Sequence, residues 1–314
     1  MTLINSFNKC FTLILSLLGL MSFAVASHAG VESTQTLVSA QKCGLLVLSH
    51  GSPASSWNKL VENLVAKIAT LNAEKKTFHA VEGAYLEFAT PCAADGIEKL
   101  EAAGCDHIIV APLFIAPSSH SHFDVPAVLG LYSSPSIRET LASENARIAR
   151  PKVPVTMIQT LNEGTLLDTF ARDAFKAIST DPSNEALVVL AHGCPDHHNI
   201  VDKTVRRIAT YCCGQIGIDY ADWAYCGVGQ TFWDSAAGAI MQAADSRKRV
   251  LVVGLYVSSS ADTIVKMARK MRGMKEGDKD PFAGKDIVFS KTSVIEHPTT
   301  AQYVLDTAAS ALKK

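Results

Sequence analysis

The chain has 314 residues, of which 48% are hydrophobic, and a formal net charge of −1. This is enough apolar material for two ordinary α/β domains, each with its own core. Because neither basic nor acidic residues are in excess, the composition gives no indication of a nucleic-acid partner or of binding to a charged membrane surface.

The first 29 residues have the order of a secretory signal peptide. Lys9 precedes an apolar run over 11–25, and small residues suitable for cleavage follow at Ala26 and Ala29. The run is shorter than the ~20 apolar residues that a membrane-spanning helix needs. We therefore predict that residues 1–29 are a cleaved signal peptide and that the mature protein is periplasmic, with no membrane anchor after cleavage.

Cysteine usage fits an exported chain only in part. Removal of Cys10 from the eight cysteines leaves seven, and an odd number cannot all pair within one chain. Several of the seven lie in apolar strand or helix patterns, so we expect most of them to be free and buried. One disulfide between Cys226 and either Cys212 or Cys213 stays open as an alternative, because exported cysteines often pair.

Apolar runs alternate with amphipathic segments in the first half of the mature chain. Strands are predicted at 43–49, 78–88, 107–115 and 153–161. After the first strand, apolar residues recur at spacings of three and four, which predicts a helix with Ser52, Ser55 or Ser56 as its cap. Thr90 and Pro91 have the order of a cap followed by proline, and they predict the start of the next helix.

The second half repeats this order of elements. Strands are predicted at 186–191, 220–225, 250–257 and 286–290, with helices between them. Strands that alternate with helices in this way favour parallel sheets with right-handed crossovers. We expect two α/β units, each with the spatial strand order 2-1-3-4, and a boundary between them near Asp181 to Ser183.

One strand with its following turn occurs twice. The apolar run that ends in His50 and Gly51 returns as a run that ends in His192 and Gly193. The repeat extends further, and its aligned segments are 84–87 with 224–227 and 113–120 with 255–262. His192 thus keeps the residue type of His50. The counterparts of Glu87 and His120 in the second half are Gly227 and Asp262.

Three polar side chains of the first half follow three different strands. His50 follows the first strand, Glu87 ends the second, and His120 lies in the loop after the third. The carboxyl ends of parallel strands open at one edge of a sheet, so these side chains are expected to meet there. Two imidazoles and a carboxylate suit a divalent transition metal, and they could equally accept protons near neutral pH.

Each of these residues also has a plainer interpretation. His50 could be a turn histidine that bonds a neighbouring backbone group, and Glu87 could be a solvated strand end. His122 lies in the same loop as His120 and could be the ligand in its place. A second cluster consists of Cys194, His197 and His198, and it could hold a second metal, although adjacent histidines at a helix start are usually exposed.

The motifs around these residues resemble the class II tetrapyrrole chelatases. The three stretches are Leu-Ser-His50-Gly-Ser52, Tyr-Leu-Glu87-Phe-Ala-Thr-Pro91, and the run from Pro112 through His120 and Asp124 to Pro126. They are most similar to the sirohydrochlorin cobaltochelatase and ferrochelatase group, in its long form with two fused copies. In that family the loop histidine stands four residues before an Asp-[Ile or Val]-Pro, which selects His120 over His122.

The resemblance implies a fold and a set of site residues. It implies two tandem chelatase-like domains of the flavodoxin-like, doubly wound α/β type, each with a four-stranded, mainly parallel sheet, which face a shared cleft. Residues 40–182 would carry the active site, and residues 183–314 would be a repeat with a degenerate site. The family's two histidines and its glutamate fall on His50, His120 and Glu87, which would be both catalytic residues and metal ligands.

The resemblance also implies an activity. The enzyme would be a lyase that inserts Co²⁺ or Fe²⁺ into a sirohydrochlorin-like tetrapyrrole, with the metal as substrate and no organic cofactor. Ser52, Ser118 and Ser119 would bind the polar periphery of the macrocycle. A homo-oligomer is compatible with the sequence. Because tetrapyrrole synthesis is cytosolic, the export signal keeps an alternative open: a periplasmic protein that binds haem, another tetrapyrrole or a metal without turnover.

The sequence departs from the family pattern in two loops. Pro53 stands where the family often has a basic residue, and Ser118 and Ser119 stand where it has mainly glycine. In addition, no Arg or Lys in the motif loops is an obvious clamp for the carboxylates of a macrocycle.

Overall fold

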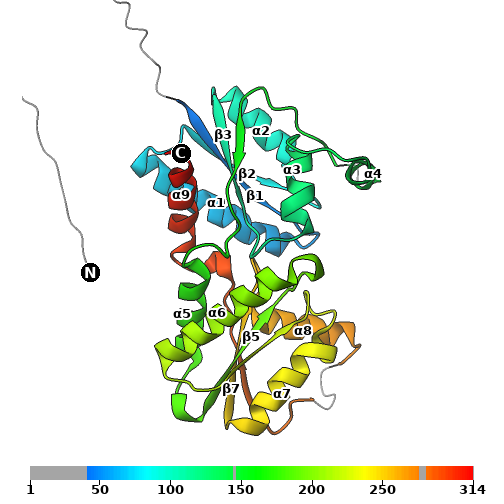
Figure 1. Cartoon of the computed structure of the whole chain (residues 1–314), viewed down its shortest axis with the longest axis vertical. Helices are drawn as coiled ribbons and strands as arrows, with labels where there is room; N and C mark the ends of the chain where they lie inside the picture. Colours follow the sequence, from blue (N-terminus) through cyan, green and yellow to red (C-terminus); the bar gives the residue numbers. More distant parts are fainter. Residues whose placement is uncertain (1–40, 144–145, 276–280, 314) are drawn as a thin grey trace, which may run out of the picture. The chain divides into compact units, whose positions relative to one another are not determined.

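The computed structural model describes residues 41–143, 146–275 and 281–313, and residues 41–314 form one compact unit (Figure 1). The signal peptide predicted at 1–29 lies outside the described residues, so cleavage and export stay predictions. Within the described ranges, no helix combines the length and the apolar character needed to cross a membrane.

Four parallel strands form the first sheet, in the order β2-β1-β3-β4. Their bounds are Cys43–Ser49 for β1, Ala80–Tyr85 for β2, His107–Pro112 for β3 and Val155–Met157 for β4. All residues of β1 are buried, as expected for a central strand with helices over both faces. The expected order is confirmed, although β4 is much shorter than the predicted range 153–161.

The second sheet has the same topology, with its parallel strands in the order β6-β5-β7-β8. The bounds are Glu185–Ala191 for β5, Ala221–Tyr225 for β6, Arg249–Leu255 for β7 and Asp286–Phe289 for β8. The predicted α/β fold with two parallel four-stranded sheets is therefore confirmed. That the two halves face a shared cleft stays a prediction.

Helices connect the strands in each half. In the first half they are α1 at Ser55–Lys75, α2 at Ala93–Ala102, α3 at Val125–Val128, α4 at Pro135–Ser143 and α5 at Leu166–Ile178. In the second half they are α6 at His198–Ile216, α7 at Ala237–Ser246, α8 at Ala261–Met271 and α9 at Thr300–Ala311.

The predicted start of α1 is wrong in its cap. The N-cap residue is Ala54, and no side chain caps this helix end. Ser52 is held differently: its backbone N–H donates to Asn58 Oδ1 at 3.0 Å, and Asn58 Nδ2 donates back to the Ser52 carbonyl at 2.7 Å. The first turn of α1 therefore fastens the loop after His50 through a side chain inside the helix.

The predicted start of α2 is also wrong. Thr90 and Pro91 belong to a turn, because the N–H of Tyr85 donates to the Pro91 carbonyl at 2.9 Å and draws this segment back to the end of β2. The N-cap is Cys92, whose N–H donates to Asp95 Oδ2 at 2.9 Å. This hydrogen bond is the main cause that lowers the pKa of Asp95.

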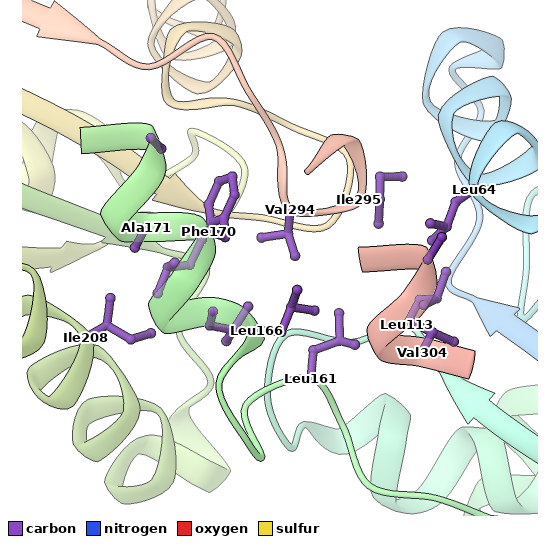
Figure 2. Packing of buried hydrophobic residues seen from close by; sticks show 14 of the residues in the cluster. Leu64, Leu113, Leu161, Leu166, Phe170, Ala171, Ile208, Val294, Ile295 and Val304 are labelled. Carbon is purple, nitrogen blue, oxygen red and sulfur yellow. The ribbon is translucent and has the colours of Figure 1, made fainter. Parts of the chain in front are cut away.

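The last helix of each half packs against the other half. Helix α5 contacts α6 and β7, whereas α9 contacts α1 and β3. Figure 1 shows the red α9 beside α1 and the green α5 beside α6. As a result, one continuous cluster of buried side chains runs from α1 and α9 through Val294 and Ile295 to α5 and α6 (Figure 2). The two sheets share this part of the core.

All seven cysteines of the described residues are free. The alternative of a disulfide from Cys226 to Cys212 or Cys213 is wrong, since these residues lie on opposite faces of the second sheet. Cys226 is packed with the side chains on the α7 and α8 face, whereas Cys212 and Cys213 pack on the α6 face. Burial raises the pKa of the Cys212 thiol to about 12.

Candidate functional site

The three side chains singled out from the sequence meet at the carboxyl edge of the first sheet. His50 follows β1 directly, Glu87 stands two residues beyond β2, and His120 begins a single helical turn at His120–Asp124 after β3. One ligand atom from each of the three residues lies within 4.8 Å of the other two. The topology thus places the three groups together, as the strand order predicts.

The backbone of Glu87 is tied to β1 although the strand β2 ends at Tyr85. Leu86 N–H donates to the Ser49 carbonyl at 2.8 Å, and Glu87 N–H donates to the His50 carbonyl at 2.9 Å. Gly51 makes this approach feasible, because a Cβ atom there would lie 1.9 Å from the Glu87 carbonyl oxygen and its φ of +90° favours glycine. Glu87 can therefore take this position only because the residue after His50 is a glycine.

His50 has a defined orientation. Its Nδ1 lies 2.9 Å from the carbonyl oxygen of Gly51, and because a carbonyl only accepts, Nδ1 carries the hydrogen of this bond. Its Nε2 lies 2.9 Å from Glu87 Oε1, in a pair whose side chains are 31% and 20% exposed. Two ligand atoms bound to one transition metal at a right angle would be about 3 Å apart. The pair can thus share a proton or hold one side of a metal ion.

His120 is oriented by Asp124. The His120 Nδ1 lies 2.8 Å from Asp124 Oδ2, across one helical turn. The ring stands edge-on to that of His50, with their centroids 4.7 Å apart. A carboxylate on one ring nitrogen fixes the tautomer and leaves the other nitrogen for a ligand. Asp124 thus joins the candidate site, and its spacing of four residues from His120 is the signal in the sequence for such a pair.

His122 lies apart from this group. It is exposed, and its ring stacks on that of His197 with the centroids 4.6 Å apart. Cys194 Sγ lies 3.7 Å from His197 Nδ1, and His198 packs edge-on against Tyr225. In the part of the chain that the structure describes, only His50, Glu87 and His120 bring three such groups together. The second metal site considered at Cys194, His197 and His198 is therefore wrong.

The second half copies the backbone of the site without its side chains. His192 Nδ1 donates to the Gly193 carbonyl at 2.8 Å, as His50 does to Gly51. Gly227 N–H donates to the His192 carbonyl at 3.0 Å, as Glu87 does to His50. Gly227 has no carboxylate to offer, and Asp262, in the place of His120, is paired with Lys266 at 2.7 Å. Among the described residues, the candidate metal-ligand set is thus confined to the first half.

The three serines predicted to bind a ligand surround this edge in different ways. Ser118 N–H donates to Ser121 Oγ at 2.8 Å, and Ser52 Oγ accepts from Ala54 N–H at 3.1 Å, so both belong to turns. Ser119 is half-buried next to His120. Tyr85 supports the Ser52 loop by donating to the Asn58 carbonyl at 3.2 Å, and burial raises the pKa of Tyr85 so that it stays a donor.

Fold and site together define an α/β protein with a candidate transition-metal site at the switch point of its first sheet. Residues 44–175 match the CbiX family. The sirohydrochlorin cobaltochelatase of Sulfurisphaera tokodaii is 34% identical over 86 residues, which are 27% of this chain and 67% of that protein. The chain belongs to the CbiX family.

Other relatives are matched over less of their length. The sirohydrochlorin cobaltochelatase of Methanococcus maripaludis is 33% identical over 88 residues, which are 28% of this chain and 58% of that protein. The chloroplastic sirohydrochlorin ferrochelatase of Arabidopsis thaliana is 29% identical over 85 residues, 27% of this chain and 36% of that protein. The chain therefore spans less than two thirds of the length of such relatives.

Solved structures agree with the fold over most of the chain. SirB from Bacillus subtilis with Fe³⁺ superposes with a TM-score of 0.60 at 16% identity, covering 87% of this chain and 98% of SirB. CbiX, the terminal enzyme for biosynthesis of sirohaem in denitrifying bacteria, superposes with a TM-score of 0.52 at 18% identity, covering 85% and 99%. At such identities the likeness shows the fold.

Proposed function

We propose that this protein is a metallochelatase that inserts a divalent metal, Co²⁺ or Fe²⁺, into a sirohydrochlorin-like tetrapyrrole. The observation that carries the proposal is the convergence of His50, Glu87 and His120 within 4.8 Å at the edge of the sheet. This set lies inside the region that matches the CbiX family. Relatives named for sirohydrochlorin chelation support the choice of macrocycle.

The reaction exchanges one divalent ion for two protons. The free macrocycle carries two pyrrole N–H hydrogens, and both leave as protons when the metal enters. His50 and His120 would hold the incoming ion through Nε2 or accept a proton there, while the carboxylate of Glu87 offsets the positive charge. Gly51 and Asp124 occupy the Nδ1 atoms of the two rings, so both working nitrogens are directed by bonds that the reaction leaves intact.

We further propose that Ser52, Ser118 and Ser119 face the polar periphery of the macrocycle. Their placement in turns beside His50 and His120 supports this role, since hydroxyl groups and loop N–H groups can donate to peripheral carboxylates. Serine-to-alanine substitution should then raise the KM for the macrocycle without a change in metal affinity. Unchanged KM in all three variants would refute it.

We also propose that the protein acts in the periplasm after removal of residues 1–29. Lys9, the apolar run over 11–25 and the small residues at Ala26 and Ala29 support export. Fractionation of cells that express the full chain, followed by N-terminal sequencing of the mature protein, tests this. A cytoplasmic protein that begins at Met1 would contradict the proposal.

The activity is tested by incubating metal-free sirohydrochlorin and Co²⁺ with catalytic amounts of the mature protein and following absorbance. We expect turnover in the parent, its loss in His50→Ala and His120→Ala, and near-parental rates in the matched control His192→Ala. Equal rates in all four proteins would show the site assignment to be wrong. Tight stoichiometric binding without turnover would instead support the alternative, a periplasmic tetrapyrrole or metal-binding protein.

A further inference from the structure

Phe88, the residue after Glu87, has an unusual backbone conformation. Its φ is +60°, and only one other non-glycine residue among those described, Lys76, has a positive φ. Lys76 is the left-handed cap of helix α1, where such a conformation is common. A bulky aromatic residue in the left-handed region is a genuine outlier, and such strain is concentrated at functional sites.

The surroundings of Phe88 enforce this conformation. On its N-terminal side, Glu87 N–H is bonded to the His50 carbonyl at 2.9 Å. Gly51 packs so closely on the Glu87 carbonyl that the chain cannot shift toward β1. On the C-terminal side, the bond from Tyr85 N–H to the Pro91 carbonyl closes the loop. The chain must therefore reverse its direction between Glu87 and Pro91, and Phe88 is the residue that adopts the left-handed conformation.

The second half turns without strain, because its left-handed residue stands one position earlier, at the counterpart of Glu87. There the left-handed residue is Gly227, with φ of +55°, which a glycine adopts freely. The next residue, Val228, aligns with Phe88, and it is partly buried against the core between α7 and α8. The fold thus allows this side chain to be packed inward. Only the half that carries the ligand set has a strained aromatic residue here.

The side chain of Phe88 is exposed beside the site. It is 62% exposed, the highest value among the large hydrophobic residues described, although an exposed ring gains nothing in water. Its ring lies next to that of His50, with centroids 5.9 Å apart and an angle of 32° between the planes. The imidazole of His50 therefore has two aromatic neighbours, the rings of Phe88 and His120.

We propose that Phe88 is the aromatic platform on which the flat macrocycle stacks while His50 and His120 deliver the metal. This inference rests on the proposed function and adds a binding residue to it. A tetrapyrrole offers a wide apolar π-face, and an exposed phenyl ring gains both burial and offset stacking from such a partner. The strained backbone keeps the ring outside the core, where the macrocycle can reach it.

The test compares Phe88→Ala, Phe88→Tyr and Phe88→Gly with the parent, using metal-free sirohydrochlorin as the probe in a fluorescence titration. Loss of the ring should weaken macrocycle binding by about tenfold or more, while Phe88→Tyr retains it. Co²⁺ affinity, measured by equilibrium dialysis, should be unchanged in all variants. Phe88→Gly should have a Tm equal to or above that of the parent, because glycine relieves the left-handed strain. Met271→Ala, at another exposed hydrophobic residue, is the matched control.

The outcomes separate this inference from the proposed function. A parent that binds or metallates sirohydrochlorin while Phe88→Ala does so equally well overturns the platform alone. A lower Tm or weaker Co²⁺ binding in Phe88→Ala shows a structural role and also overturns it. A parent that binds the macrocycle through Phe88 without turnover supports the platform and overturns the chelatase. If Phe88→Ala changes the oligomeric state, the ring is covered by a second copy and the platform is wrong.

Discussion

The carboxylate of Glu87 lies 2.9 Å from Nε2 of His50, and the same backbone bond that delivers Glu87 to this position delivers Gly227 to His192 in the second half. The two halves therefore share a way of bringing the ends of two strands together. They differ in the residue at this point, which is the charged Glu87 in the first half and Gly227 in the second. The candidate site of the first half therefore depends on two side chains, Glu87 and His120, which the second half replaces by Gly227 and Asp262.

Replacement of Glu87 by Gln should weaken metal binding. The amide keeps the size of the side chain but removes the negative charge that faces His50 Nε2 at 2.9 Å. We expect Co²⁺ affinity to fall by at least about tenfold, which corresponds to about 1.4 kcal/mol. Isothermal titration with Co²⁺ measures this, with Glu62→Gln on the exposed face of α1 as the control. Equal affinities of the two variants would exclude Glu87 as a ligand.

Replacement of Asp124 by Asn should act through His120. The Nδ1 to Oδ2 contact of 2.8 Å would lose its charge, and the ring would lose its fixed tautomer. Loss of such a supporting carboxylate costs about 10- to 100-fold in metal affinity or activity. The visible spectrum of bound Co²⁺ should change as well, which a purely structural defect would not produce. Asp306→Asn, at an exposed ion pair, serves as control, and a parental spectrum in Asp124→Asn would refute the role.

The stability of the second half should depend on pH through Glu185, a fully buried carboxylate at the start of β5. Burial raises its pKa, but donors from Ser179 Oγ, Thr180 N–H and Asp181 N–H together lower the pKa below the usual value of 4.5. A lowered folded-state pKa means that the stabilisation is complete above the unfolded-state pKa. It is lost as the pH falls through the folded-state pKa.

The variant Glu185→Gln should therefore lose about 1–3 kcal/mol of unfolding free energy at pH 7, because a neutral amide would replace the charged acceptor of two backbone N–H groups. The part of the acid sensitivity below pH 4.5 that comes from this carboxylate should disappear with it. Urea unfolding at neutral and acidic pH measures both effects. If parent and variant lost stability in parallel on acidification, the carboxylate would not be the group responsible.

The contact between Asp168 on α5 and Arg207 on α6 should contribute to stability. Asp168 is buried, and Arg207 donates to it and also to the Asn162 carbonyl at 3.1 Å. The arginine thus holds both α5 and the segment that leads into it. We expect Asp168→Ala to lower the unfolding free energy by about 1–3 kcal/mol.

A double-mutant cycle with Arg207→Ala separates the pair from the packing of each side chain. The cycle should give a coupling of at least about 0.5 kcal/mol in urea unfolding. Additive effects would show that the two side chains act independently.

Local rules account for the elements and for the place of the site. The apolar runs that end in His50 and His192 are strands because a central parallel strand is buried on both faces. The preference for right-handed crossovers then leads to the order of both sheets. With that order known, His50, Glu87 and His120 come to one edge without any knowledge of side-chain packing. This is why a site at this edge could be proposed from the residues, whereas the choice of His120 over His122 came from the family resemblance.

Contacts between distant segments decided the rest. Helix α2 begins at Ala93, later than the sequence predicts, because the N–H of Tyr85 bonds the Pro91 carbonyl. The packing of α5 and α9 on opposite halves depends on the shared core around Val294. The separation of Cys226 from Cys212 follows from which face of a sheet each helix covers. Likewise, the strained left-handed backbone of Phe88 follows from the close approach of the Glu87 carbonyl to Gly51. Sequence periodicity reports which residues are buried, whereas the partner that each one meets is set when the segments pack.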